Sequence, residues 1–191
     1  MDRVPPNQVE YGRFLAELEQ RIASARLAAA RSVNRQLILH YWDIGRSILE
    51  RQQTVGQGES IIEMLAEDLR STDPGNIGYS ARNLRSMKQF YEEYSAPRFW
   101  QQAVAKSGSS RPLPQRRTVG TSESHKKMPR LLAEVPWEQH LLILNRVKEP
   151  AARIYYLRAS ARLGWSRDVL LNQIKAQVYE GTPAGKKAQS V

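Results

Sequence analysis

The segment that decides the fold is Gly78–Tyr94, which reads GYSARNLRSMKQFYEEY. Ser80 stands just before Ala81, where a serine hydroxyl can accept one of the amide hydrogens that the first turn of a helix leaves unpaired. Apolar side chains follow at the spacing of one helical face. The pattern predicts a helix from Ser80 to about Tyr94, with an inward face made of Leu84, Met87, Phe90 and Tyr91.

A much longer helical pattern precedes this segment, from about residue 8 to residue 53. Small or apolar residues recur there at steps of three or four, which is the period of a single helical face. They are Tyr11, Leu15, Leu18, Ile22, Ala25, Ala29, Val33, Leu37, Tyr41, Ile44 and Ile48. Gly45 costs about 1 kcal/mol relative to alanine inside a helix. The sequence therefore allows either one long helix or two helices in line with a bend at Gly45.

The remaining patterns are also helical. We expect helices over about Glu59–Arg70 and over Trp137–Arg146. Pro150 opens a further helix that Gly164 ends as a left-handed cap, and Ser166 caps the last one. No strand alternation stands out. The sequence predicts an all-α fold, in which the long N-terminal helix packs with a helix-turn-helix-like pair and a C-terminal three-helix segment.

Composition divides the chain into four parts. The N-terminal helical part, with the helix-turn-helix-like unit, spans residues 8–96, and the C-terminal helical part, residues 131–180, is expected to pack on it as one domain. Residues 97–130 read as a flexible linker and residues 181–191 as a disordered tail. The linker holds eight basic residues and one acidic residue, so it carries most of the net charge of +10. The linker can attract DNA non-specifically. Its charge does not indicate that the nearly neutral helical parts bind DNA.

The composition also limits the compartment. The chain has no cysteine, which excludes disulfides and thiolate metal sites. It has no run of about 18 apolar residues, and its first residues lack the apolar core of a signal peptide. We therefore expect a cytoplasmic protein that does not contact a membrane.

Catalytic and metal sites find little support in the sequence. The three histidines, His40, His125 and His140, are far apart, and His140, one turn after Trp137, is interpreted as a packing residue. Metal-dependent nucleases of the PD-(D/E)XK class need an acidic residue two positions before a lysine. None of the lysines in this chain has one. We expect no catalytic centre, no metal and no cofactor, and hence no enzyme.

The candidate recognition surface is the polar face of the predicted helix that begins at Ser80. In helix-turn-helix units the second helix enters the major groove of DNA and presents its N-terminal side chains to the bases. Arginine reads guanine or phosphate, asparagine reads adenine, and serine holds a phosphate. The candidate DNA-contacting residues are Ser80, Arg82, Asn83, Arg85 and Lys88. The alternative is an ordinary solvated face, and the loop of about nine residues before it is longer than usual.

Two further features leave alternatives open. Arg158 and Arg162 lie one turn apart, with Arg153 and Arg167 nearby, and these arginines can grip phosphates or form surface ion pairs. The long N-terminal helix has the spacing of a coiled-coil face, and a helix that extends beyond its own core needs a partner. A homodimer through this helix is therefore a second hypothesis, compatible with the first.

A set of uncommon motifs spans residues 10–180. They are Val33-Asn34, Tyr41-Trp42-Asp43-Ile44-Gly45, Gly78-Tyr79-Ser80 with Asn83-Leu84, Met87 and Phe90-Tyr91, Pro136-Trp137 with His140, Arg153 with Tyr156, and Gly164-Trp165-Ser166 with Leu170 and Ile174. Together they resemble the N-terminal domain of YhcG-type proteins. The two tryptophan motifs and the paired Phe-Tyr make the resemblance specific.

The resemblance implies a domain that usually precedes a PD-(D/E)XK nuclease domain in bacterial proteins and serves as its DNA-recognition or assembly part. The chain departs from that pattern in its basic insert around Gly108–Lys127, and it stops where a nuclease domain would begin. We expect a non-catalytic DNA-binding or targeting module of a YhcG-type nuclease system. It is either a truncated remnant or a stand-alone module with a separate nuclease partner. The alternative is a dimerisation or protein-interaction module without nucleic-acid contact.

Overall fold

The computed structural model describes residues 8–55, 60–72, 75, 77–97, 99–101 and 128–182. In these residues the chain forms helices and no strands. The elements are α1 (Gln8–Val55), α2 (Ser60–Thr72), the 3-10 turn η1 (Ile77–Tyr79), α3 (Ala81–Ser95), α5 (Arg130–Ala133), α6 (Trp137–Arg146), α7 (Pro150–Leu163) and α8 (Arg167–Lys175). The predicted all-α fold and its principal helices are confirmed.

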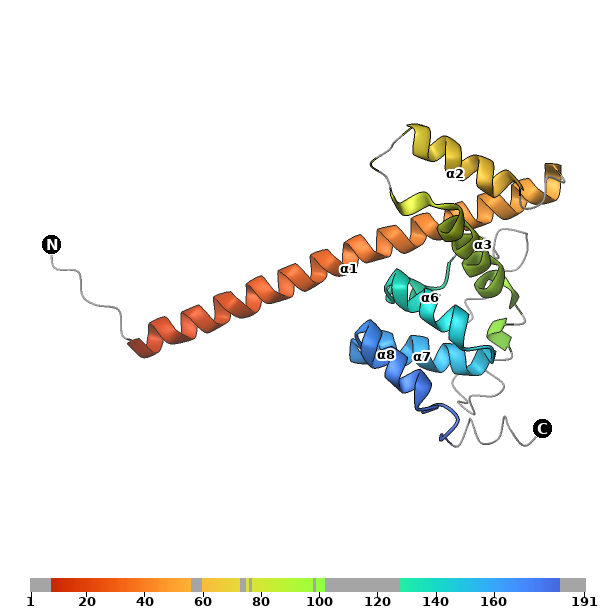
Figure 1. The fold of residues 1–191 in the computed structure, drawn as a ribbon. Coiled ribbons are helices and arrows are strands. Elements are labelled where there is room, and N and C mark those ends of the chain that lie inside the picture. The colour runs from red at the N-terminus through yellow and green to blue at the C-terminus, as the bar shows by residue number, and fades with distance from the viewer. Residues whose placement is uncertain are drawn as a thin grey trace, which may run out of the picture.

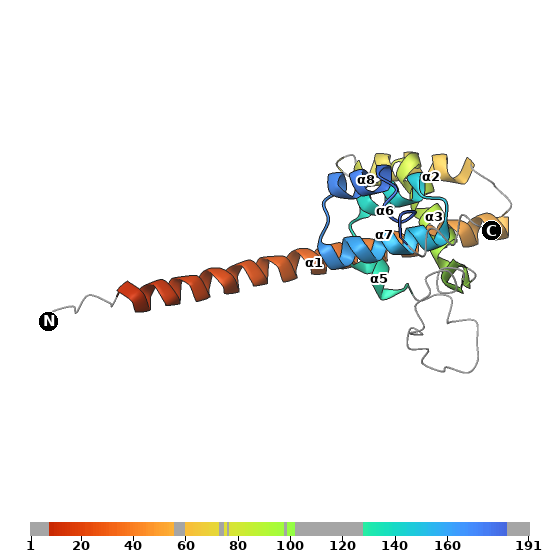
Figure 2. The same ribbon diagram turned by 90° about the horizontal axis from the view of Figure 1, so that it is seen from below.

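Helix α1 is continuous through Gly45, so the structure answers the open question in favour of one long helix. Its C-terminal half lies against the other helices, whereas its N-terminal half extends away from them (Figures 1 and 2). The helical body begins near Asn34, whose amide donates to the carbonyl oxygens of Ala133 (3.1 Å), the last residue of α5, and of Val135 (3.3 Å). Ile38, one turn further on, is fully buried.

Gly45 lies where α1 crosses α3. A Cβ atom at Gly45 would stand 2.1 Å from the carbonyl oxygen of Met87 and 3.0 Å from the Cβ of Tyr91. Glycine is therefore present because the two backbones approach closely. The bend that the sequence allowed at this position does not occur.

Two buried clusters hold the body together. One lies between α1, α2 and α3 and comprises Tyr41, Ile48, Ile62, Ala66, Leu84 and Met87. The larger cluster joins α1 and α3 to the C-terminal helices α6, α7 and α8, with Trp42, Phe90 and Tyr94 at its aromatic centre. The predicted caps are confirmed: Ser80 and Ser166 accept amide bonds, and Gly164 is left-handed with φ of 63°.

Parts of the sequence-based division lie outside the described residues. Most of the predicted linker, residues 102–127, and the tail from residue 183 onward are among them. His125 and the basic insert around Gly108–Lys127 fall in the first of these stretches. Within the described part of the chain, no helix combines the length and apolar character needed to cross a membrane.

His140 is a packing residue, as the sequence indicated. Its ring is fully buried, stands 4.8 Å from the ring of Phe90, and shares a hydrogen bond of 2.9 Å between Nε2 and the carbonyl oxygen of Leu132. Desolvation lowers the pKa of His140 to about 4, although the backbone hydrogen bonds act in the opposite direction. The residue is therefore neutral in the folded protein at pH 7.

This burial predicts a pH-dependent stability. The unfolded chain binds a proton at His140 near pH 6.5 and the folded chain only near pH 4, so the free energy of unfolding falls as the pH drops from 6.5 toward 4. We expect His140 to contribute a loss of about 2 kcal/mol between pH 7 and pH 5. Urea denaturation at both pH values should show this loss in the wild type and a smaller one in His140→Gln, which keeps a donor for Leu132. Equal losses in the two proteins would contradict the assignment.

Candidate nucleic-acid interface

The N-terminus of α3 is built as a capped and rigid helix start. Ser80 has extended backbone angles, and its Oγ accepts the backbone N–H of Asn83 at 3.3 Å. The carbonyl oxygen of Ser80 accepts from the amide of Leu84 at 2.9 Å. The first turn of α3 is thus fixed by the side chain that the sequence identified as its cap.

Asn83 connects three elements. Its Nδ2 donates to the carbonyl oxygen of Gly78 in η1 at 2.6 Å, and its Oδ1 accepts from the indole Nε1 of Trp137 in α6 at 2.9 Å. Both ends of the amide are therefore engaged inside the protein. A base contact by Asn83 would require at least one of these hydrogen bonds to be shared or broken.

The outer face of α3 is a narrow polar strip. Arg82, Arg85 and Gln89 are exposed along it at steps of three and four, and Lys88 is half-buried at its edge. Arg85 forms an ion pair with Glu63 of α2. Arg82 has no ion pair with another described residue, so its guanidinium is the most available cation of this strip.

The structure thus brings the five candidate residues together on about two turns of helix but gives them different tasks. Ser80 and Asn83 hold the helix start, Arg85 bridges to α2, Arg82 is exposed, and Lys88 is half-buried. DNA contact by these residues stays a prediction. Gln89, which the sequence reading left out, shares the strip and has the side chain type that reads adenine.

A second basic surface was not identified from the sequence. Arg31 and Arg35, one turn apart on α1, and Arg130 at the start of α5 line a groove of about 410 Å³. Arg130 is paired with Glu134 at 3.1 Å. Because Arg130 lies 95 positions after Arg35 in the sequence, only the fold shows that it meets the arginines of α1.

The C-terminal arginines separate into different classes. Arg153 is buried, donates from Nε to the carbonyl oxygen of Val147 at 2.6 Å, and pairs with Glu93 of α3 at 2.6 Å. It therefore ties α7 to α3. Arg158, Arg162 and Arg167 are exposed, and Arg167 lies 3.7 Å from Asp168.

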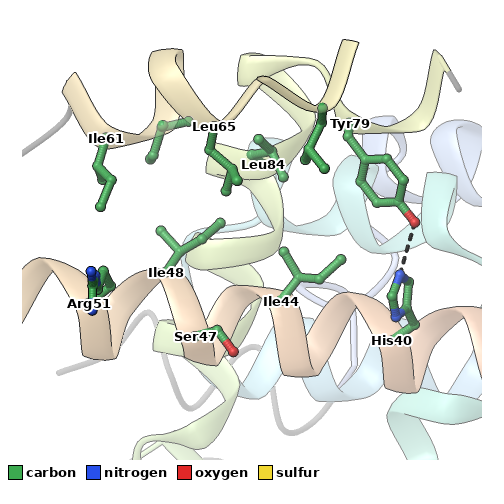
Figure 3. Close-up of a pocket in the computed structure, with 11 residues that line it drawn as sticks. His40, Ile44, Ser47, Ile48, Arg51, Ile61, Leu65, Tyr79 and Leu84 are labelled. Carbon is green, nitrogen blue, oxygen red and sulfur yellow. Dashed lines mark hydrogen bonds between the residues drawn. The ribbon is translucent and has the colours of Figure 1, made fainter. Parts of the chain in front are cut away.

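An apolar cavity of about 640 Å³ lies between α1 and α2 (Figure 3). Ile44 and Ile48 form its floor, and Ile61 and Leu65 face them from α2. The cavity is closed at one end by a hydrogen bond of 2.9 Å between His40 and Tyr79. The polar groups at that end satisfy each other, and nowhere in the described residues do three or more potential metal ligands gather.

One protein family covers almost all of the helices described above. The model of the DUF1016 N-terminal domain matches residues 17–181. The chain belongs to this family. This DUF1016 N-terminal domain thus includes about the last four-fifths of α1, then α2, α3 with its cap, and the C-terminal helices.

One curated relative is similar to this DUF1016 domain. It is an Escherichia coli (strain K12) protein named "Putative nuclease YhcG", 32% identical over 169 residues, which cover 84% of this chain and 44% of that protein. The chain therefore spans less than half the length of this relative. No solved structure matches the chain. The resemblance to YhcG-type proteins is confirmed.

Proposed function

We propose that this chain is the DNA-targeting module of a nuclease system and that the cleavage residues belong to another domain or subunit. The nuclease association is carried from the name of the E. coli relative and from family membership. The placement of the cleavage residues elsewhere is supported by the sequence, in which no lysine has an acidic residue two positions before it. In this role the chain binds DNA and also binds its nuclease partner.

The observation that carries the proposal is the exposed strip of α3. Arg82, Arg85 and Gln89 stand in a row on a helix whose start is fixed by Ser80 and Asn83. Because the backbone of the helix is already fixed, binding orders only the side chains, and this row has the length of about two turns. It fits contacts to phosphates and base edges along one face of a duplex.

The second basic surface supports the same reading. Arg31, Arg35 and Arg130 converge on one groove, and arginine forms bidentate bonds with phosphate oxygens. These contacts would hold the backbone of DNA without reading its sequence. The binding should therefore be steeply salt-dependent.

Removing the arginines of α3 should weaken DNA binding. We expect Arg82→Ala combined with Arg85→Ala to reduce the affinity for a labelled duplex by about 10-fold or more in a fluorescence anisotropy titration. Both side chains are exposed, so the fold should be retained. Arg167→Ala, an exposed arginine on α8, is the matched control and should bind as the wild type does. Equal affinity in all three proteins would refute the proposal.

A specific observation favours an interaction role in addition. The N-terminal half of α1 lies apart from the helical body (Figures 1 and 2) and exposes apolar side chains along its length. A surface of this kind is typical of a site that binds another protein chain.

A further inference from the structure

The N-terminal half of α1 carries an apolar stripe that nothing covers in the described residues. All side chains described between residues 10 and 33 are exposed. The exposed fractions on the stripe run from 40% for Leu18, through 43% for Ile22, to 69% for Val33. A helix exposed on all sides gains no stabilisation from burying its apolar face. A row of such side chains therefore marks a surface that is covered in the working state.

The same face of α1 is covered further along. The helical period that connects Ile22 and Val33 continues to His40, Ile44 and Ile48. Ile44 and Ile48 form the floor of the cavity beneath α2, and His40 lies at its end beside Tyr79 of η1 (Figure 3). One face of α1 thus has a covering helix over its second half and none over its first half. An added helix along the stripe would complete the arrangement.

We propose that this helix is α1 of a second copy of the chain, lying antiparallel. The stripe has a gradient of side-chain size: the bulky residues come first and the small residues follow. The bulky residues are Tyr11, Leu15, Leu18 and Ile22, and the small ones are Ala25, Ala29 and Ser32. In the heptad spacing of a coiled coil, Ser32 continues this row and Val33 lies beside it at the edge of the stripe. In a parallel pair equal positions meet, so alanine would face alanine and leave a gap. In an antiparallel pair bulky residues of each copy pack on small residues of the other.

The size gradient also sets the register. Leu18 of each copy lies opposite Ala29 of the other, and Ile22 lies opposite Ala25. The interface is isologous, so each contact occurs twice around a two-fold axis that crosses α1 between residues 23 and 24. The bodies of the two copies then lie at opposite ends of the shared rod, roughly 30 Å apart along it at about 1.5 Å per residue.

The charges beside the stripe select the same register. Glu19 of each copy lies next to Arg26 of the other, and these opposite charges attract. A slip of one heptad in one direction brings the two copies of Glu19 together, and a slip in the other direction brings the two copies of Arg26 together. A parallel pair would place Arg21 of one copy beside Arg26 of the other. Like charges therefore disfavour each alternative.

Single cysteines test this arrangement cleanly, because the chain has none of its own. Full-length Leu18→Cys and Ala29→Cys are oxidised with copper–phenanthroline, separately and as a mixture at tens of micromolar. We expect a covalent dimer only in the mixture, with one chain of each variant identified by mass. In either variant alone the two cysteines lie roughly 16 Å apart along the pair, whereas a disulfide needs Cα atoms within about 7 Å.

Each other outcome overturns the proposal. Cross-linking of either variant with itself would show a parallel pair, and no cross-linking, together with a monomer in analytical ultracentrifugation, would show that no pair forms. Gln20→Cys lies on the opposite face of α1 and, mixed with Ala29→Cys, should not cross-link. The experiment uses no DNA, so its result and that of the DNA titration are independent.

Discussion

Replacing Gly45 with alanine adds only one methyl group, yet among substitutions of this size we expect it to destabilise the protein most. The new Cβ would stand 2.1 Å from the carbonyl oxygen of Met87 and 2.7 Å from its carbonyl carbon. Both are backbone atoms of α3, so no side-chain rotation can relieve the contact. The helices must move apart, which loosens the packing of Met87 and Leu84 against α1 and α2. We expect a loss of about 3 kcal/mol or more in the free energy of unfolding.

Helix propensity acts in the opposite direction and is too small to compensate. Alanine is better than glycine inside a helix by about 1 kcal/mol. Gly12→Ala is the matched control, since it lies in the same helix and its Cβ would meet no atom within 4 Å. Thermal unfolding followed by circular dichroism should show a large decrease in Tm for Gly45→Ala and none for Gly12→Ala. Similar Tm values for the two variants would contradict the close crossing of α1 and α3.

Replacing Asn83 with alanine should be the second large effect. The change leaves the carbonyl oxygen of Gly78 and the indole N–H of Trp137 without their partners. Unpaired groups in a partly buried site cost roughly 1–3 kcal/mol each, so we expect a loss of about 2–4 kcal/mol. Chemical denaturation measures this loss. The side chain of Trp137 should also become more mobile, which lowers the tryptophan fluorescence anisotropy.

Two controls separate this structural role from a role in DNA reading. Gln89→Ala removes an exposed amide from the same helix and should leave the stability unchanged. Asn83→Asp keeps the acceptor for Trp137 but loses the donor for Gly78, so it should lie between Asn83→Ala and the wild type in stability. If Asn83→Ala retains full stability and loses only affinity for DNA, Asn83 is a recognition residue and the structural role is wrong.

Local patterns in the sequence predicted most of the helices. Periodicity identified α1 and α3, and single residues identified helix ends: Ser80 caps the start of α3 and Gly164 caps the end of α7, as their chemistry favours. These features depend on neighbours within a few residues. They are therefore visible without knowledge of the fold.

Features that depend on distant parts of the chain could not be predicted in this way. A bend at Gly45 was left open as an alternative because the backbone of Met87, which explains the glycine, lies 42 positions later in the sequence. Asn83 was grouped with the recognition residues because Trp137 was not known to be its partner. Arg85 was also grouped with the recognition residues, because its partner Glu63 lies on another helix. A side chain type suggests a chemistry, but the tertiary partner decides whether it is available.

The exposed strip of α3 is the central claim for function, and the salt dependence of DNA binding tests it most directly. The affinity for a duplex is measured at several salt concentrations for the wild type and for Arg82→Ala combined with Arg85→Ala. If both arginines contact phosphates, the slope of log affinity against log salt should be shallower in the variant by about 2. Parallel lines for the two proteins, or a wild type that does not bind DNA at low salt, would contradict the account.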